Sequence, residues 1–334
     1  MNTPLVSVII PNYNYLCYLE QRISSVLNQT CKDIEIILLD DASTDGSQDY
    51  LESLSAIPQV THIIYNQTNT GSPFSQWEKG LELARGKYIW IAEADDLADV
   101  TFLQKLLPAM EYNDQIVLSF SASQMIDTEG QAINKDYDHL ERRKYTHTRL
   151  ASIYDGTAFV KKNMYWRNWV YNASGVLFRR SAITEKALKA LSMHYSGDWL
   201  FWSNIANQGK VVEYHERLNK FRFHTSSTTH KGAYMGFIED IDIVKTFNRD
   251  YSISTLKRWI RGGRFFRRMS KMGFSQEQTN KIRQKISEDI CPELCGRLAD
   301  LLSKICPWLA SETHDSVAGQ ALQFPLQGIE ACPK

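Results

Sequence analysis

Short apolar runs alternate with helical patterns along the first third of the chain. The runs rich in β-branched residues occupy positions 6–10, 34–39, 60–65, 88–92 and 116–120. Between the first two runs, apolar residues recur at steps of three and four and predict a helix with one apolar face: Leu16, Leu19, Ile23, Val26 and Leu27. Further helices are predicted over 47–54, 75–84 and 101–111. This alternation is typical of an α/β fold with a mostly parallel sheet flanked by helices.

Beyond about residue 225 the strand pattern stops and helical patterns follow. We therefore predict a catalytic α/β domain over 1–232, a basic helical appendage over 233–306, and a poorly ordered tail over 307–334. Gly262 and Gly263 fall inside the helical pattern, and because glycine weakens helices they predict a break there.

Composition narrows the class of protein. The 334 residues are 43% hydrophobic and 23% charged, as in ordinary globular proteins. The 38 basic and 38 acidic residues cancel, so no global charge indicates nucleic-acid binding. No apolar run approaches the roughly 20 residues that span a bilayer, and the N-terminal residues lack a signal-peptide pattern. We expect a cytoplasmic protein, and the six scattered cysteines predict free thiols.

Three polar clusters directly follow predicted strands: PNYN at 11–14, DDASTD at 40–45 and EADD at 93–96. Open α/β sheets bind ligands beyond the carboxyl ends of their strands, so these clusters predict one binding site. Asp95 and Asp96 repel each other unless a cation lies beside them, and their oxygens suit magnesium or manganese. Capping of the helix that starts near residue 99 is the alternative interpretation of both.

Five motifs occur in order along the chain: VSVIIPNYN, VLNQT, IEIILLDDASTDGS, LARGKYIWIAEADD and GDWLFW. Together they resemble the family 2 inverting glycosyltransferases of the GT-A fold, over roughly residues 5–230. The resemblance implies transfer of a sugar from a nucleoside-diphosphate sugar to a hydroxyl of a glycan acceptor. It further implies a lipid-linked acceptor in surface polysaccharide synthesis, such as O-antigen or capsule.

The resemblance also implies roles for residues of the donor site. Pro11, Tyr13, Asp41 and Asp95 are expected to bind the nucleotide sugar, with the Tyr13 ring against the base. The alternatives are a core position for Tyr13 and turn chemistry for Asp41. Many members of the family carry Asp where Glu93 stands, which leaves open whether Asp95 or Asp96 ligates the metal.

Two residues of the later motifs complete the expected site. Asp198, in GDWLFW, is the expected catalytic base, and N-capping of the following helix is its alternative role. His224 is expected to join Asp95 and Asp96 at a divalent metal, manganese or magnesium, and a purely structural role is the alternative. An arginine that is frequent in the family's helix after residue 72 is replaced here around Gln76 and Trp77.

Residues 252–275 carry seven basic side chains and no acidic one: Lys257, Arg258, Arg261, Arg264, Arg267, Arg268 and Lys271. On one helix, many of these would form a basic face beside an apolar one, which predicts association with an anionic membrane surface. We therefore expect a peripheral location on the inner face of the cell membrane. The alternative is a helix packed on the catalytic domain with solvated charges. For the whole protein, the alternative function is a catalytically silent scaffold that binds nucleotide sugars.

Overall fold

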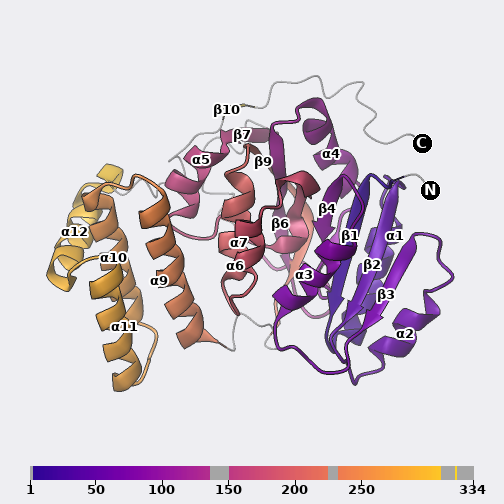
Figure 1. The fold of residues 1–334 in the computed structure, drawn as a ribbon, viewed down its shortest axis with the longest axis horizontal. Coiled ribbons are helices and arrows are strands. Elements are labelled where there is room, and N and C mark those ends of the chain that lie inside the picture. Colours follow the sequence, from indigo (N-terminus) through magenta and orange to yellow (C-terminus); the bar gives the residue numbers. More distant parts are fainter. Residues whose placement is uncertain (1–2, 136–149, 225–231, 310–319, 322–334) are drawn as a thin grey trace.

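The computed structural model describes residues 3–135, 150–224, 232–309 and 320–321 (Figure 1). Strands and helices alternate in the predicted order: β1 (Val6–Asn12), α1 (Leu16–Leu27), β2 (Ile34–Asp40), α2 (Ser47–Ser53), β3 (Val60–Tyr65), α3 (Pro73–Leu83) and β4 (Tyr88–Ile91). β1 pairs in parallel with β2 and β4, and β2 pairs in parallel with β3. The carboxyl ends of these four strands therefore meet at one edge of the sheet.

The rest of the sheet is mixed. The strands and helices that follow β4 along the chain are β5 (Leu97–Ala98), α4 (Phe102–Tyr112), β6 (Ile116–Ile126), β7 (Ala151–Asp155), α5 (Gly156–Phe159), the π-helical turn η2 (Val160–Met164), η3 (Ala173–Gly175), β8 (Val176–Arg179), η4 (Arg180–Ala182), α6 (Glu185–Ala190), α7 (Gly197–Ala206) and β9 (Lys210–Arg222). The strand order is β10-β7-β9-β6-β8-β4-β1-β2-β3, with β10 (Gln320–Ala321) at one edge and β5 paired to β9. The predicted α/β fold is confirmed, and the parallel pairing around β1 gives way to antiparallel pairing where β8 lies between β4 and β6.

The sheet carries apolar side chains on both faces. Ile9 and Ile37 point into a cluster with residues of α3 and α7, while Val8 and Ile36 point into a second cluster with residues of α1 and α4. Both faces are thus covered by helices, which explains why β1 and β2 appear in the sequence as continuous apolar runs.

In the described residues after β9, four helices follow one another: α9 (Ala233–Asp250), α10 (Thr255–Met269), α11 (Gln276–Asp289) and α12 (Glu293–Ile305), then the short turn η5 (Pro307–Leu309). They lie together beside α6 and α7, on the side away from β1 to β3 (Figure 1). Phe237 and Ile241 of α9 belong to the same buried cluster as Phe201 of α7. The predicted helical appendage therefore shares a hydrophobic core with the sheet domain.

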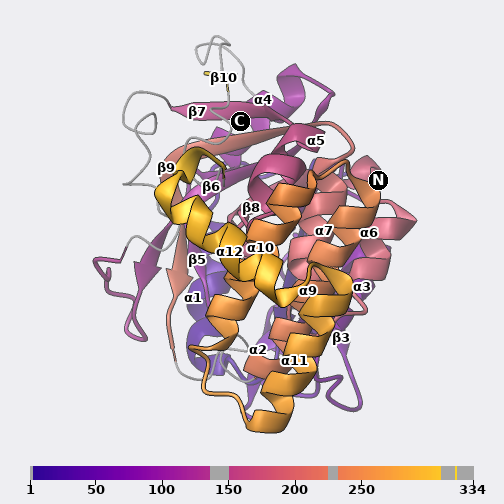
Figure 2. The same cartoon turned by 90° about the vertical axis from the view of Figure 1, so that its left-hand side faces the viewer.

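Gly262 and Gly263 do not break the helix, contrary to the prediction, because α10 runs through both. A Cβ added to Gly263 would lie 2.0 Å from the Gly296 carbonyl oxygen, and one added to Gly262 would lie 2.3 Å from Cys291 Sγ. The glycines allow α12 to cross α10 at close range, as Figure 2 shows from the outer side. Close packing of two helices accounts for them.

The basic residues of α10 face protein partners. Arg261 is 8% exposed and its guanidinium lies 4.3 Å from the Phe265 ring centre. Arg268 Nη1 donates to Asp240 Oδ2 at 2.5 Å, and Arg267 Nη1 donates to Asp300 Oδ2 at 2.9 Å. These arginines contact protein groups, as in the packed-helix alternative, but the side chains of Arg267 and Arg268 remain 39% and 47% exposed, and association with a membrane stays a prediction.

The predictions on membrane helices, cysteines and the C-terminal tail can also be compared with the structure. Within the described residues, no helix is long and apolar enough to cross a membrane. Four cysteines are free as expected: Cys17, Cys291, Cys295 and Cys306. Cys31 is disulfide-bonded, so the free-thiol prediction is wrong there. Most of the predicted tail over 307–334 lies outside the described residues.

Candidate active site

The three polar clusters meet at the carboxyl edge of the parallel strands. Asn12, at the end of β1, donates from Nδ2 to Asp40 Oδ2 at 2.8 Å, and its carbonyl accepts from the Asp41 N–H at 2.9 Å. On the other side of β1, the Ala92 N–H donates to the Ile9 carbonyl at 2.8 Å and sets the start of the 93–96 segment. Strand register alone thus brings the clusters together.

The loop after β1 presents an aromatic ring to solvent. Pro11 is buried at the end of β1, whereas Tyr13 is 45% exposed. Asn14 adopts a left-handed backbone conformation with φ 55°, and its N–H donates to Ser43 Oγ at 2.9 Å. The loop is therefore anchored to the loop after β2, and the Tyr13 ring is available for a ligand rather than used in the core.

Asp41 is buried and surrounded by donors. Its Oδ1 accepts from Asn66 Nδ2 at 2.6 Å and from Gln76 Nε2 at 2.9 Å. Its Oδ2 accepts from the Thr70 hydroxyl at 2.8 Å and from the Thr70 N–H at 3.0 Å. The carboxylate thus ties the 66–72 loop and α3 to the end of β2, and a hydrogen bond to a nucleotide base would have to replace or share one of these.

Asp96 is buried, and protein groups occupy both of its oxygens. Oδ2 accepts from Ser174 Oγ at 2.7 Å and from Asn172 Nδ2 at 2.8 Å, while Oδ1 accepts from the Arg222 N–H at 2.9 Å. Burial, and then the charge of Asp95, raises its pKa to about 6. These contacts join the segment after β4 to the end of β9. Asp96 therefore has a structural role in positioning these two segments.

Asp95 pairs with His224. His224 Nε2 lies 2.9 Å from Asp95 Oδ2, and the imidazole packs edge-on against Tyr15 with ring centres 5.5 Å apart. His224 follows directly after β9, so the two predicted metal residues come together from positions 129 apart in the chain. Asp95, and not Asp96, is the carboxylate beside His224.

Arg222 fixes the backbone around this pair. It is 1% exposed, and its guanidinium donates to the carbonyls of Asp95 (2.7 Å), Asp127 (2.8 Å) and Thr128 (2.9 Å). A fourth hydrogen bond reaches Gln21 Oε1 at 3.0 Å. Because so many of its N–H groups serve protein acceptors, Arg222 acts here as a clamp between β9, the 93–96 segment and the loop after β6.

Arg22 is a buried cation that the sequence analysis missed. Its Nε donates to the Glu93 carbonyl at 2.7 Å, and within the described residues Nη1 and Nη2 have no hydrogen-bond partner. Burial lowers its pKa to about 10, and the charges of Asp96 and Asp95 oppose that shift. The signal in the sequence is a basic residue on the apolar face of α1, between Leu19 and Ile23.

Glu93 is held by α3. Trp77 Nε1 donates to Glu93 Oε1 at 2.8 Å. Although part of Glu93 is accessible to solvent, desolvation and then the charge of Asp95 raise its pKa to about 8. Gln76 and Trp77, which occupy the region where the family often has an arginine, therefore hold Asp41 and Glu93 in this chain.

Asp198 lies in the first turn of α7, and the N-cap position belongs to Ser196. The capping role considered for Asp198 therefore does not describe its place. Asn168 Nδ2 donates to Asp198 Oδ2 at 2.8 Å. Burial raises the pKa of Asp198 to about 7, and the charge of Asp240 adds to the shift. A carboxyl group with a pKa near neutrality is well suited to accept a proton.

α7 packs on α3, the helix that also contacts Glu93. Trp77, which donates to Glu93, packs against Trp202 and Phe201 of α7 with ring centres 5.6 and 6.1 Å apart. A Cβ on Gly197 would lie 3.0 Å from the Phe74 ring of α3. α3 thus connects the end of β4 to the start of α7.

Residues of α9 and α10 hold the segment before Asp198. The Glu239 carboxylate accepts the N–H groups of His194, Tyr195 and Ser196, each at 2.8 Å. Asp240 accepts from Ser196 Oγ at 2.8 Å and pairs with Arg268. No pattern in the sequence identifies these residues, because a helical charge pattern does not tell which carboxylate will reach a distant backbone segment.

The residues present fit a divalent metal that retains other ligands. Within the described residues, no group of three or more His, Cys, Asp or Glu side chains is placed to hold a metal ion. Asp95 and His224 offer an oxygen and a nitrogen on one side. Magnesium typically takes one or two protein carboxylates together with waters and substrate phosphates, so a two-residue site is adequate when a diphosphate is bound.

An α/β fold with acidic side chains and an exposed aromatic ring at the carboxyl ends of its parallel strands is suited to binding a nucleotide there. The chain belongs to glycosyl transferase family 2, whose family model matches residues 7–182.

Curated relatives and a solved structure are similar to this chain. An uncharacterized glycosyltransferase of Haemophilus influenzae is 29% identical over 231 residues, which are 68% of each chain. A putative teichuronic acid biosynthesis glycosyltransferase of Bacillus subtilis, TuaG, is 35% identical over 132 residues, 40% of this chain and about half (52%) of that protein. Residues 1–349 of Staphylococcus aureus TarS, solved with UDP-GlcNAc, share the fold with a TM-score of 0.60 at 15% identity, over 93% of this chain and 88% of that one.

Proposed function

We propose that this glycosyltransferase moves a sugar from a nucleoside-diphosphate sugar to a hydroxyl of a glycan acceptor, with inversion at the anomeric carbon. The observation that carries the proposal is the Asp95–His224 pair at the carboxyl edge of the sheet, together with Asp198 in the first turn of α7. Inversion follows from a single displacement, which needs one proton acceptor and a stabilised leaving group.

On the donor side, we propose that Tyr13 packs against the base and that Pro11 and Asp41 shape the base pocket. Asp95 and His224 would hold manganese or magnesium, which would neutralise charge on the departing diphosphate. Asp96 was predicted as a further metal ligand, but its three protein hydrogen bonds favour a positioning role instead. Arg222 and Arg22 hold the 93–96 segment in place by donating hydrogen bonds to its backbone carbonyls.

On the acceptor side, we propose that Asp198 takes the proton of the attacking hydroxyl. Its pKa near 7 leaves a large ionised fraction at neutral pH, while the conjugate acid is not so strong that proton transfer becomes unfavourable. Asn168 Nδ2 orients one oxygen of the carboxylate.

The donor is tested by thermal unfolding of the purified chain with UDP-, dTDP- and GDP-sugars, with and without manganese. UDP-sugars come first, because TarS was solved with UDP-GlcNAc. A ligand that binds only the folded state raises the unfolding midpoint. A metal-dependent rise with one nucleotide, followed by release of the nucleoside diphosphate when acceptor is added, supports the proposal. Donor binding without any transfer would favour the silent scaffold.

For the acceptor, we propose a lipid-linked saccharide of surface polysaccharide synthesis, a role supported by the similarity to TuaG, a putative teichuronic acid biosynthesis glycosyltransferase. A location at the inner face of the cell membrane stays a prediction. Because α10 directs many of its arginines into the protein, co-sedimentation of the intact chain with anionic vesicles is the direct test. Failure to co-sediment would remove the membrane part and leave the transferase proposal intact.

A further inference from the structure

Arg22 is a cation enclosed among apolar side chains. It lies on α1 between Leu19 and Ile23, which belong to a buried cluster with Trp90, and Arg22 itself is 0% exposed. Its guanidinium carbon lies 5.9 Å from the centre of the Trp90 ring. Removing a charge from water costs free energy unless other charges or hydrogen bonds compensate. For Arg22 this compensation has to come from inside the protein.

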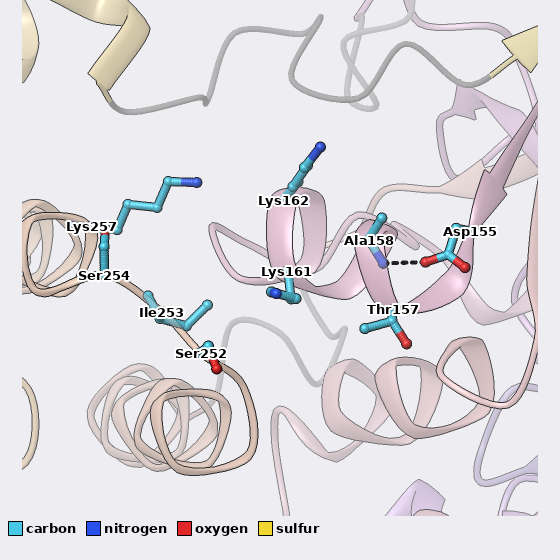
Figure 3. Close-up of a pocket in the computed structure, with 9 residues that line it drawn as sticks. All are labelled: Asp155, Thr157, Ala158, Lys161, Lys162, Ser252, Ile253, Ser254 and Lys257. Atoms are coloured by element: carbon cyan, nitrogen blue, oxygen red, sulfur yellow. Dashed lines mark hydrogen bonds between the residues drawn. The ribbon is translucent and has the colours of Figure 1, made fainter.

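Other basic side chains have a different environment. Lys161, Lys162 and Lys257, which line a pocket between η2 and the start of α10, all keep contact with solvent (Figure 3). Water and salt screen such charges. The charge of Arg22 lacks this screening and therefore acts more strongly on the groups around it.

One hydrogen bond fixes Arg22 to the 93–96 segment. Its Nε donates to the Glu93 carbonyl at 2.7 Å, and the same carbonyl accepts the Asp96 N–H at 3.2 Å. Arg22 is thus held against the turn that carries Asp95 and Asp96. Within the described residues, its Nη1 and Nη2 have no hydrogen-bond partner. The carboxylates of this turn therefore act on the guanidinium through space and not through a direct hydrogen bond.

The charges that act on Arg22 are those of the carboxylate cluster. Burial lowers the pKa of Arg22, and the charges of Asp96, Asp95 and Glu93 counteract this effect. The influence is mutual, because burial raises the pKa of Asp96 and the charge of Arg22 counteracts the rise. A divalent metal at Asp95 would have to compete with this cation for the same negative charge.

We propose that Arg22 is a fixed counter-cation of the 93–96 segment, which offsets the charges of Asp95 and Asp96 and so weakens metal binding until a nucleoside diphosphate supplies further negative charge. The inference rests on the proposed function, in which Asp95 and His224 hold the metal. Because Arg22 is buried and acts through the two aspartates, it is a positioning residue. The metal then enters the site together with the donor.

Isothermal titration of the full-length chain with manganese chloride alone tests the inference. Arg22→Met removes the charge and keeps an unbranched apolar side chain in the cluster, so manganese should bind at least tenfold more tightly than to the parent. A neighbouring charge typically changes the affinity of a carboxylate for a proton by about that factor or more, and a divalent ion carries twice the charge. Arg22→Lys keeps the positive charge and should restore the weak binding of the parent.

Lys257→Met is the control for net charge. It removes one positive charge from the pocket of Figure 3, where solvent screens it, and should bind manganese as the parent does. Adding Asp95→Ala to Arg22→Met should abolish the gain in affinity. A gain that persists without Asp95 would come from another place and would overturn the inference.

The expected gain distinguishes a charge effect from a structural one. If Arg22 only held the Glu93 carbonyl, its loss would loosen the segment and weaken manganese binding. Equal or weaker binding by Arg22→Met therefore overturns the inference. Arg22→Gln is a second uncharged variant that retains an N–H group for the carbonyl. It should also bind manganese more tightly than the parent, and it takes the place of Arg22→Met if that variant does not fold.

Thermal unfolding provides a second readout. Without donor, manganese should raise the unfolding midpoint more in Arg22→Met than in the parent, because tighter binding to the folded state stabilises it further. If the variant shows no larger rise while manganese still promotes donor binding to the parent, the inference fails and the metal proposal stands. If manganese promotes donor binding to neither form, the metal assignment fails and the inference falls with it.

Discussion

The two centres of the proposed active site are held by different parts of the molecule. Asp95 and its neighbours are fixed by the sheet, its loops and α1, through Arg222 at the end of β9 and Arg22 of α1. Asp198 is fixed by Asn168 and, through the segment before it, by Glu239 and Asp240 of α9. The donor side thus depends on the α/β domain alone, and the base side depends on the C-terminal helices.

This difference changes how the helical appendage over 233–306 is interpreted. The domain boundary predicted at residue 232 separates Asp198 from the side chains that position it, and the buried cluster also crosses that boundary. Figure 1 shows why, since α9 lies along α6 and α7 and not at a distance from them. The C-terminal helices therefore help to position the proposed base, and their association with a membrane stays a prediction.

The largest effect is expected from Asp198→Asn. Removing the proton acceptor should lower the transfer rate about 10²- to 10⁴-fold, since that is the usual contribution of general base catalysis. Binding of donor and metal should be unchanged, because the donor centre is held independently. Stopped assays of nucleoside diphosphate release and thermal shifts with donor measure the two quantities. A variant with parental turnover would refute the role of Asp198.

Asp95→Ala should instead impair the binding of donor and metal. Loss of this ligand should weaken metal-dependent donor binding by at least the 10- to 100-fold that loss of an outer-shell partner already costs. Asp96→Asn is the informative comparison: it should lower thermal stability, because its oxygens accept three protein hydrogen bonds, and should reduce metal affinity less than Asp95→Ala does. If calorimetry shows the reverse order of metal affinities, the roles of the two residues must be exchanged.

The two sides also differed in how far the sequence predicted them. Strand periodicity, the loop rule for parallel sheets and the family motifs predicted the β1, β2 and β4 loops. The pairing of β5 with the end of β9 places the residues just before β5 beside those just after β9, and so brings Asp95 to His224. Arg22 was missed because a cation on an apolar helical face is normally solvated, and only the structure shows Glu93, Asp95 and Asp96 near it.

The C-terminal helices were predicted as helices, but their contacts were not. Gly262 and Gly263 were taken for a break because helix propensity ignores what lies outside the helix, and α12 needs the space they leave. Likewise, the charge pattern of α10 does not reveal that Arg268 pairs with Asp240, 28 residues away. Tertiary pairing decides such cases, and one sequence carries little record of it.

Glu239→Ala tests the support of the base directly. Three backbone N–H groups lose a charged acceptor, so the segment before Asp198 should loosen and the free energy of unfolding should fall by about 1 to 3 kcal/mol. We expect kcat to fall roughly tenfold, because a base that is no longer positioned acts less efficiently, while donor KM stays the same. Glu277→Ala on the exposed face of α11 is the control and should change stability by less than about 0.5 kcal/mol. A rise in donor KM with unchanged kcat would contradict the division between the two sides.

The smallest and most specific effect is expected from Arg268→Ala. The charge of Asp240 raises the pKa of Asp198, and Arg268 offsets that charge through its ion pair. Removing the arginine should therefore raise the pKa of Asp198 further and move the acid limb of the kcat profile to higher pH, by roughly half a unit because the pair is partly exposed. Arg268→Lys keeps the positive charge and should leave the profile in place. A merely structural role would lower kcat equally at every pH, so a uniform loss without a displaced limb would show that α10 supports the base only by packing.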